Sequence, residues 1–169
     1  MTEENSDLAN KVQEHLNNLI RAKNRLSELA SMELTQKLTR PDAQTNERWD
    51  AGQIWAHLAE FGEYWLPQLL KITSTPPDVI EDFGRTKSDP HRIQMIESER
   101  HIPRSEHLAT ILQDIDCLAH ELTEFTPENW SCRGRHETLG VMTVDEFLHE
   151  FAIGHYFQHI AQLEELQNG

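Results

Sequence analysis

Two histidines near the end of the chain, His155 and His159, are four residues apart. Side chains at positions i and i+4 project from one face of a helix, so both imidazoles can point at the same place. A third imidazole from a facing helix would complete a set of neutral nitrogen ligands for a divalent metal. His57, which lies in an earlier apolar stretch, is the candidate for that third ligand.

The spacing of these histidines is a weak motif by itself. The chain contains ten histidines. Random placement of that many histidines would give an i, i+4 pair about half the time. Their positions say more, because all three lie on helix faces that otherwise carry Leu, Ile, Phe and Val. An unpaired polar group on such a face costs about 1–3 kcal/mol. Two interpretations remain open: a metal site, or core histidines that each bond a backbone carbonyl or a carboxylate.

Four stretches with a helical apolar period must position these side chains, and no segment alternates at period two for long enough to predict a sheet. The first covers residues 6–38 and ends before Pro41, where a backbone N–H is missing. The third covers residues 104–123, and Pro127 follows it. The second and fourth stretches contain the three histidines.

The starts of those two helices are marked by capping boxes. Asp50 with Gln53, and Thr143 with Glu146, have the spacing in which the first side chain caps the helix and the second reaches back. The earlier box places His57 on an inward face. The expected inward face of the last helix consists of Val144, Leu148, Phe151, His155, His159, Gln162 and Leu166.

Residues 74–103, between the second and third helices, have no clear period and contain several prolines. Loops this long in compact domains are usually functional or mobile. Four helices joined by one long crossover predict an all-α fold, a four-helix bundle, with metal and ligand sites built from side chains on facing helices. The length suits a single domain over residues 1–169.

Composition excludes several other classes of protein. The formal net charge of −14 opposes binding to nucleic acid. No apolar run has the length of a membrane span, and no secretory signal is visible, so we expect no membrane partner. Cys117 and Cys132 form no C-x-x-C pair, which favours a reducing, cytoplasmic location.

Three segments of the chain resemble the DinB/YfiT-like superfamily of metal-dependent enzymes. They are IWAHLAE at 54–60, LGVMTV at 139–144 and HYFQHIAQ at 155–162, with FGR at 83–85 as a weaker feature. The resemblance covers most of the chain in order. It implies a four-helix bundle with a long crossover, and a divalent metal held by His57, His155 and His159. It also implies a small-molecule substrate and a homodimer.

Three imidazole ligands leave at least one coordination position open, which is typical of a catalytic zinc site. Imidazole suits zinc, nickel, iron or copper, of which we expect zinc or nickel. The open position can hold a low-molecular-weight thiol as thiolate, which predicts a thiol S-transferase or isomerase like the mycothiol-dependent maleylpyruvate isomerases and bacillithiol transferases of the superfamily. The alternatives are a hydrolase that uses a metal-bound water and a module that binds metal or ligand without catalysis.

Further polar residues have candidate roles around this site. Glu60, one turn from His57, is the candidate catalytic base for hydrolysis, and the alternative is a solvated charge at the helix edge. Gln162, one turn beyond His159, could orient a ligand or a bound water, or be an ordinary amide at the bundle edge. His91 and Arg92 in the crossover could contact an acidic substrate, although charged loop residues are usually solvated.

Overall fold

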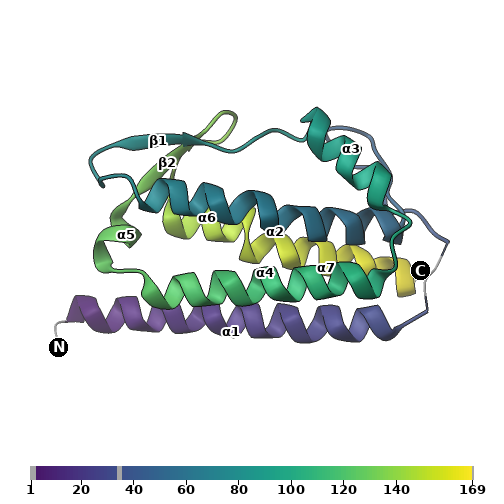
Figure 1. Cartoon of the computed structure of the whole chain (residues 1–169), viewed down its shortest axis with the longest axis horizontal. Helices are drawn as coiled ribbons and strands as arrows, with labels where there is room; N and C mark the ends of the chain where they lie inside the picture. The colour runs from purple at the N-terminus through teal and green to yellow at the C-terminus, as the bar shows by residue number, and fades with distance from the viewer. Residues whose placement is uncertain (1–2, 34–35, 169) are drawn as a thin grey trace.

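The computed structural model describes residues 3–33 and 36–168. Four helical segments form a bundle: α1 (Glu3–Ser31), α2 (Ala51–Thr73), α4 (Arg104–Glu124), and a last segment made of α6 (Val144–Phe151) and α7 (Ile153–Asn168). In Figure 1, α1 and α4 lie along the lower side, with α2, α6 and α7 above them. α1 packs on α4 and α7, while α2 packs on α4, α6 and α7. The predicted all-α four-helix bundle is confirmed.

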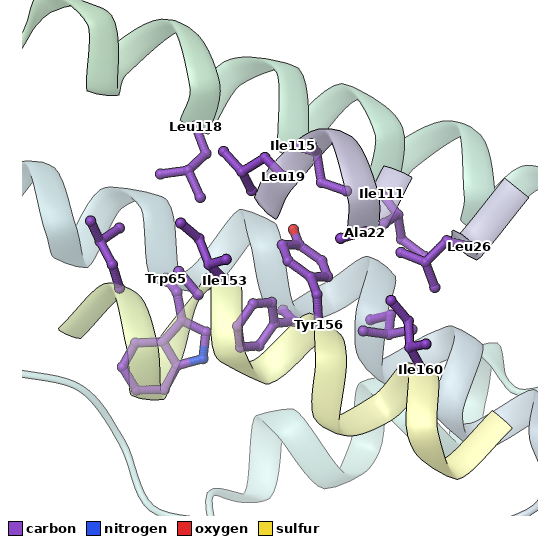
Figure 2. Close-up of a cluster of buried hydrophobic side chains, with 14 of the residues drawn as sticks. Leu19, Ala22, Leu26, Trp65, Ile111, Ile115, Leu118, Ile153, Tyr156 and Ile160 are labelled. Atoms are coloured by element: carbon purple, nitrogen blue, oxygen red, sulfur yellow. The ribbon is translucent and has the colours of Figure 1, made fainter. Parts of the chain in front are cut away.

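The core of the bundle lies between α1, α4 and α7, with Trp65 of α2 beside it (Figure 2). The labelled side chains, all buried, are Leu19, Ala22, Leu26, Trp65, Ile111, Ile115, Leu118, Ile153, Tyr156 and Ile160. Burying each large apolar side chain contributes roughly 1.5–3 kcal/mol. Because one face of α7 is turned towards α1 and α4, a different face remains for contact with α2.

The long crossover between α2 and α4 contains two elements that the sequence did not predict. These are a strand, β1 (Ile80–Phe83), and a helix, α3 (Pro90–Glu99). Asp89 caps α3 by accepting the backbone N–H of Arg92 at 2.7 Å, and Pro90 occupies the first turn. In Figure 1 the strand lies near one end of α2 and α3 near the other.

A small sheet corrects the expectation that the chain contains no strands. β1 pairs in parallel with β2 (Arg133–His136), which pairs antiparallel with β3 (Gly140–Thr143). The three strands have four residues each, too short for a period-two pattern to stand out. The sheet and the short helix α5 (Pro127–Ser131) connect the ends of the main helices.

The first helix ends earlier than predicted. It stops at Ser31, and residues 36–38 are not helical, while residues 34–35 of the predicted stretch lie outside the described ranges. Leu38 is exposed, so it lacks the packing that would extend a helical face. The chain instead turns back, and Thr39 N–H donates to the carbonyl of Trp49 at 2.8 Å.

Within the described residues, the helices lack the combination of length and apolar character needed to cross a membrane.

Candidate metal centre

The start of α2 sets the position of His57. The carboxylate of Asp50 accepts the N–H of Gln53 at 2.9 Å, and the side-chain oxygen of Gln53 accepts the N–H of Asp50 at 3.0 Å. This is the capping box that the sequence indicated. It fixes the rotation of the first two turns, and His57 is buried with only 3% of its surface exposed.

The helix that carries the other two histidines is broken, whereas the sequence analysis treated it as continuous. Its backbone leaves the helical region at Ala152, with φ −138° and ψ −91°, and α7 starts again at Ile153. Gly154 follows at once, and a Cβ there would overlap the carbonyl oxygen of His149. The break therefore depends on a glycine just before His155, and it sets the direction in which the histidine face of α7 points.

The side chains of His57, His155 and His159 converge on one point. The Nε2 atom of His155 lies 2.9 Å from Nε2 of His57 and 2.9 Å from Nε2 of His159. All three ligand atoms lie within 4.8 Å of one another, and in the described part of the chain this is the cluster suited to a metal ion. The cluster contains no carboxylate or thiol.

Hydrogen bonding on the far side of the rings fits a metal on the Nε2 side. The side-chain oxygen of Gln162 lies 2.7 Å from Nδ1 of His159, so Nδ1 donates and Nε2 keeps its lone pair. Nε2 of His155 faces the Nε2 atoms of both His57 and His159. A hydrogen on one of these three nitrogens can form a hydrogen bond with only one of the other two, so the third nitrogen is left without a partner. A cation shared by the three lone pairs satisfies all of them. The three residues therefore fit a divalent metal.

Burial keeps these imidazoles neutral. Desolvation lowers the pKa of His159 from its ordinary 6.5 to about 4, although the hydrogen bond that His159 donates to Gln162 acts in the opposite direction. Desolvation also lowers the pKa of His57 and of His155 well below the ordinary value, and neighbouring histidines add to that effect. Neutral imidazole is the form that binds metal, so the site needs to release no protons near neutral pH.

Glu60 is buried beside His57 and takes part in an ion pair. Its Oε2 lies 3.7 Å from Nδ1 of His57, and its Oε1 pairs with the guanidinium of Arg85, both side chains being less than a tenth exposed. The guanidinium carbon of Arg85 also lies 3.8 Å from the ring centre of Tyr64. Oε2 of Glu60 and Nδ1 of His57 have no closer hydrogen-bond partner. The carboxylate thus faces the side of the ring away from the metal-binding nitrogen.

Two aromatic rings enclose the cluster. Phe61 stacks on His155 with ring centres 4.4 Å apart. Trp49 lies edge-on to His57 at 5.3 Å and nearly parallel to His159 at 6.1 Å. Arg92 lies over the Trp49 ring, with its guanidinium carbon 5.3 Å from the ring centre. These rings exclude water from one side of the site and strengthen electrostatic interactions inside it.

The structure brings together the five residues that the sequence placed around the histidines: His57, Glu60, His155, His159 and Gln162. Of the two candidates in the crossover, Arg92 lies against Trp49, whereas His91 is exposed. Sequence reasoning gave little weight to two neighbours. Arg85 was part of a weak motif, and Trp49 was not among the candidate residues. Their approach to the site depends on how the crossover and the residue 39–49 segment fold back, which no local pattern shows.

Comparison with known proteins identifies the family. A family model described as the DinB superfamily matches residues 10–163. The chain belongs to the DinB superfamily. Its resemblance to that superfamily, first noticed in three short segments, therefore holds over nearly the whole length. A comparison with curated protein sequences finds no match for this DinB-superfamily chain.

Three solved structures share the fold at low sequence identity. YfiT from Bacillus subtilis, described as a probable metal-dependent hydrolase with an unusual four-helix bundle topology, has a TM-score of 0.73 and 16% identity, with 99% of this chain and 88% of that chain covered. A mutant of the mycothiol-dependent maleylpyruvate isomerase has a TM-score of 0.65 and 13% identity, with 90% and 60% covered. An uncharacterized protein from Clostridium difficile 630 has a TM-score of 0.58 and 8% identity, with 99% and 97% covered.

Proposed function

We propose that this DinB-superfamily chain is a metal-dependent enzyme that activates a low-molecular-weight thiol, either for transfer to an electrophile or for a thiol-dependent isomerisation. The observation that carries the proposal is the convergence of three neutral Nε2 atoms from His57, His155 and His159. Three ligands leave a coordination position open for a further group. Zinc or nickel is the metal we expect.

A metal held there would supply a Lewis acid that keeps a thiol sulfur deprotonated at neutral pH. The chain's own residues supply the rest. Gln162 holds His159 in the tautomer that leaves Nε2 free, and Phe61 and Trp49 keep one side of the site dry. A desolvated thiolate is a strong nucleophile, and transfer by thiolate attack needs no additional base.

The position of Glu60 is the reason for preferring thiol activation to hydrolysis. Hydrolysis was predicted with Glu60 as the base, which requires a carboxylate close to the attacking water. Glu60 instead faces Nδ1 of His57 and pairs with Arg85. Those contacts support a positioning role, in which the carboxylate holds the His57 ring.

Hydrolysis remains the second candidate function. It is supported by the likeness to YfiT, described as a probable metal-dependent hydrolase. The thiol candidate has its own support in the likeness to a mycothiol-dependent isomerase, of which this chain covers 60%. Both candidates act on a small molecule. A homodimer is part of the same proposal, and sedimentation equilibrium would test it.

The experiment that separates the candidates uses the zinc-loaded protein. Conjugation of glutathione, cysteine, mycothiol and bacillithiol to 1-chloro-2,4-dinitrobenzene is measured beside hydrolysis of p-nitrophenyl acetate. We expect conjugation with at least one thiol, lost in the His155→Ala variant and kept in His149→Ala, which removes an exposed histidine of α6. Hydrolysis with no conjugation would favour the second candidate. The absence of both reactions would indicate a binding module without catalysis.

A further inference from the structure

Arg92 is a half-buried cation without an acidic partner among the described residues. Its neighbours in the crossover are paired, Arg85 with Glu60 and Lys87 with Asp42 at 2.8 Å. The guanidinium of Arg92 donates to the carbonyl oxygen of Lys87 at 3.0 Å, and in the described ranges it makes no other side-chain hydrogen bond. Burial lowers the pKa of Arg92, and the charge of Arg85 adds to that effect. The carboxylates of Glu60, Glu47 and Asp89 act in the opposite direction, although they form no ion pair with it. A guanidinium presents five N–H donors, so most of its binding capacity is unused.

The position of Arg92 connects it with the histidine cluster. It lies over one face of the Trp49 ring, and that ring also contacts His57 and His159. The guanidinium therefore lies at the edge of the candidate metal site.

The segment that carries Arg92 is firmly attached to α2. The guanidinium of Arg100, at the end of α3, pairs with Asp50, and Glu97 accepts a hydrogen bond from Gln53. Gly52 allows the backbone of Arg100 to approach so closely that a Cβ would overlap its carbonyl oxygen. The capping box of α2 thus holds α3 as well, and the position of Arg92 is preorganised relative to His57.

The charges at the site are unbalanced. The three imidazoles bring no negative charge, and the carboxylate of Glu60 is already paired with Arg85. A divalent ion and Arg92 would both add positive charge in a region shielded from water, where an uncompensated charge is costly. A single guanidinium with unused parallel donors is well matched to one carboxylate.

We propose that the cosubstrate thiol carries a carboxylate, and that Arg92 binds this group while the reacting sulfur lies at the histidine cluster. The inference rests on the proposed function, because it names the class of molecule that uses the same site. Arg92 is then a specificity-determining residue. This carboxylate-binding role contrasts with the net charge of the chain, −14, which would repel anions elsewhere on the surface.

The test compares three probes on the zinc-loaded protein by calorimetry and NMR. 3-Mercaptopropionate carries both thiol and carboxylate, 3-mercapto-1-propanol carries the thiol alone, and propionate carries the carboxylate alone. We expect 3-mercaptopropionate to bind about tenfold more tightly than the neutral thiol. This is the gain in affinity expected from one charge-assisted hydrogen-bonded pair. Arg92→Gln removes that preference without weakening the neutral thiol, and Arg92→Lys retains part of it.

Lys87→Gln is the matched control, because it removes one positive charge from the same segment at a residue already paired with Asp42. It should change the preference by less than about twofold. Equal affinity of the two thiols in the wild type, or a loss in Arg92→Gln that both thiols share, would overturn the inference.

Propionate separates this inference from the proposed function. If neither thiol binds the zinc-loaded protein, thiol activation fails, and the response to propionate alone decides the role of Arg92. A saturable change in the Arg92 side-chain NMR signal, together with loss of propionate binding by calorimetry in Arg92→Gln, supports the carboxylate site. No saturable change contradicts it.

Discussion

At the scale of single residues, the chemistry of the histidine cluster depends on which ring nitrogen of each imidazole carries hydrogen. Gln162 settles this for His159 by accepting from Nδ1 at 2.7 Å. For His57 the carboxylate on the Nδ1 side belongs to Glu60, whose Oε2 lies 3.7 Å from that nitrogen. Partners of this kind fix the ring orientation and raise the basicity of the ligand nitrogen.

Replacing Gln162 with Leu is expected to weaken zinc binding about 10- to 100-fold, the usual effect of removing such a partner from a metal-binding histidine. Gln162→Glu keeps an acceptor for Nδ1 and should retain most of the affinity. Competition with a chromophoric chelator measures the change. Gln158→Leu, at an exposed position on the same helix, serves as the control, and an equal loss in that variant would count against a specific role for Gln162.

The depressed pKa values predict how the stability of the metal-free protein depends on pH. His159 titrates at about 4 in the folded state and at about 6.5 when unfolded, so between these values the unfolded chain binds more protons. The free energy of unfolding should therefore be highest above about pH 6.5 and fall as the pH decreases towards 4. Urea denaturation across this range measures the slope.

The His159→Gln variant provides the control for the pH experiment. It removes one of the buried imidazoles, so its stability should decrease less steeply between pH 6.5 and 4 than that of the wild type. A wild-type stability that is flat in this window, or a variant with the same slope, would contradict burial of neutral histidines.

At the scale of elements, the site depends on how its helices begin and where one of them breaks. The start of α2 could be predicted, because a capping box is a local pattern that acts within four residues. The break between α6 and α7 could not be predicted, since it depends on the close approach of Gly154 to the carbonyl of His149. Likewise, α3 and the three short strands depend on contacts between distant segments, and no local period reveals them.

Substituting Gly154 with Ala tests the helix break. The added methyl group would overlap the carbonyl oxygen of His149, and relief of such a clash typically costs about 1–3 kcal/mol. Urea denaturation should show a loss of that size together with weaker zinc binding, because α7 must shift. Gln158→Ala, on an exposed part of the same helix, should leave both almost unchanged. An unchanged stability in Gly154→Ala would show that the break is not constrained.

The crossover is joined to α2 by a buried ion pair and to the residue 39–49 segment by an exposed one. Arg85→Met leaves the carboxylate of Glu60 buried without its cation, which is expected to cost about 3–5 kcal/mol. Lys87→Met breaks the exposed pair with Asp42 and should cost less than about 1 kcal/mol. Denaturant midpoints of the two variants make the comparison. Similar losses in both would contradict a structural role specific to the buried pair.

At the scale of the whole molecule, the bundle brings side chains of α2 and α7 to one point although their positions in the sequence are far apart. The sequence predicted the fold class and grouped His57, His155, His159, Glu60 and Gln162 around one site, because helical periodicity and caps define faces. The surroundings of that site were less predictable. Arg85 and Trp49 approach it through irregular segments and Arg92 through the short helix α3, and the paths of these segments depend on packing across the entire chain.

The metal content of the purified protein is the most direct test of a metal centre at His57, His155 and His159. The wild type, the His155→Ala/His159→Ala double variant and His149→Ala are purified without a metal-binding tag and analysed for bound metals by mass spectrometry. We expect close to one divalent ion per chain in the wild type and in His149→Ala, with almost none in the double variant while its circular dichroism remains helical. Equal metal content in all three proteins would contradict a metal centre at these histidines.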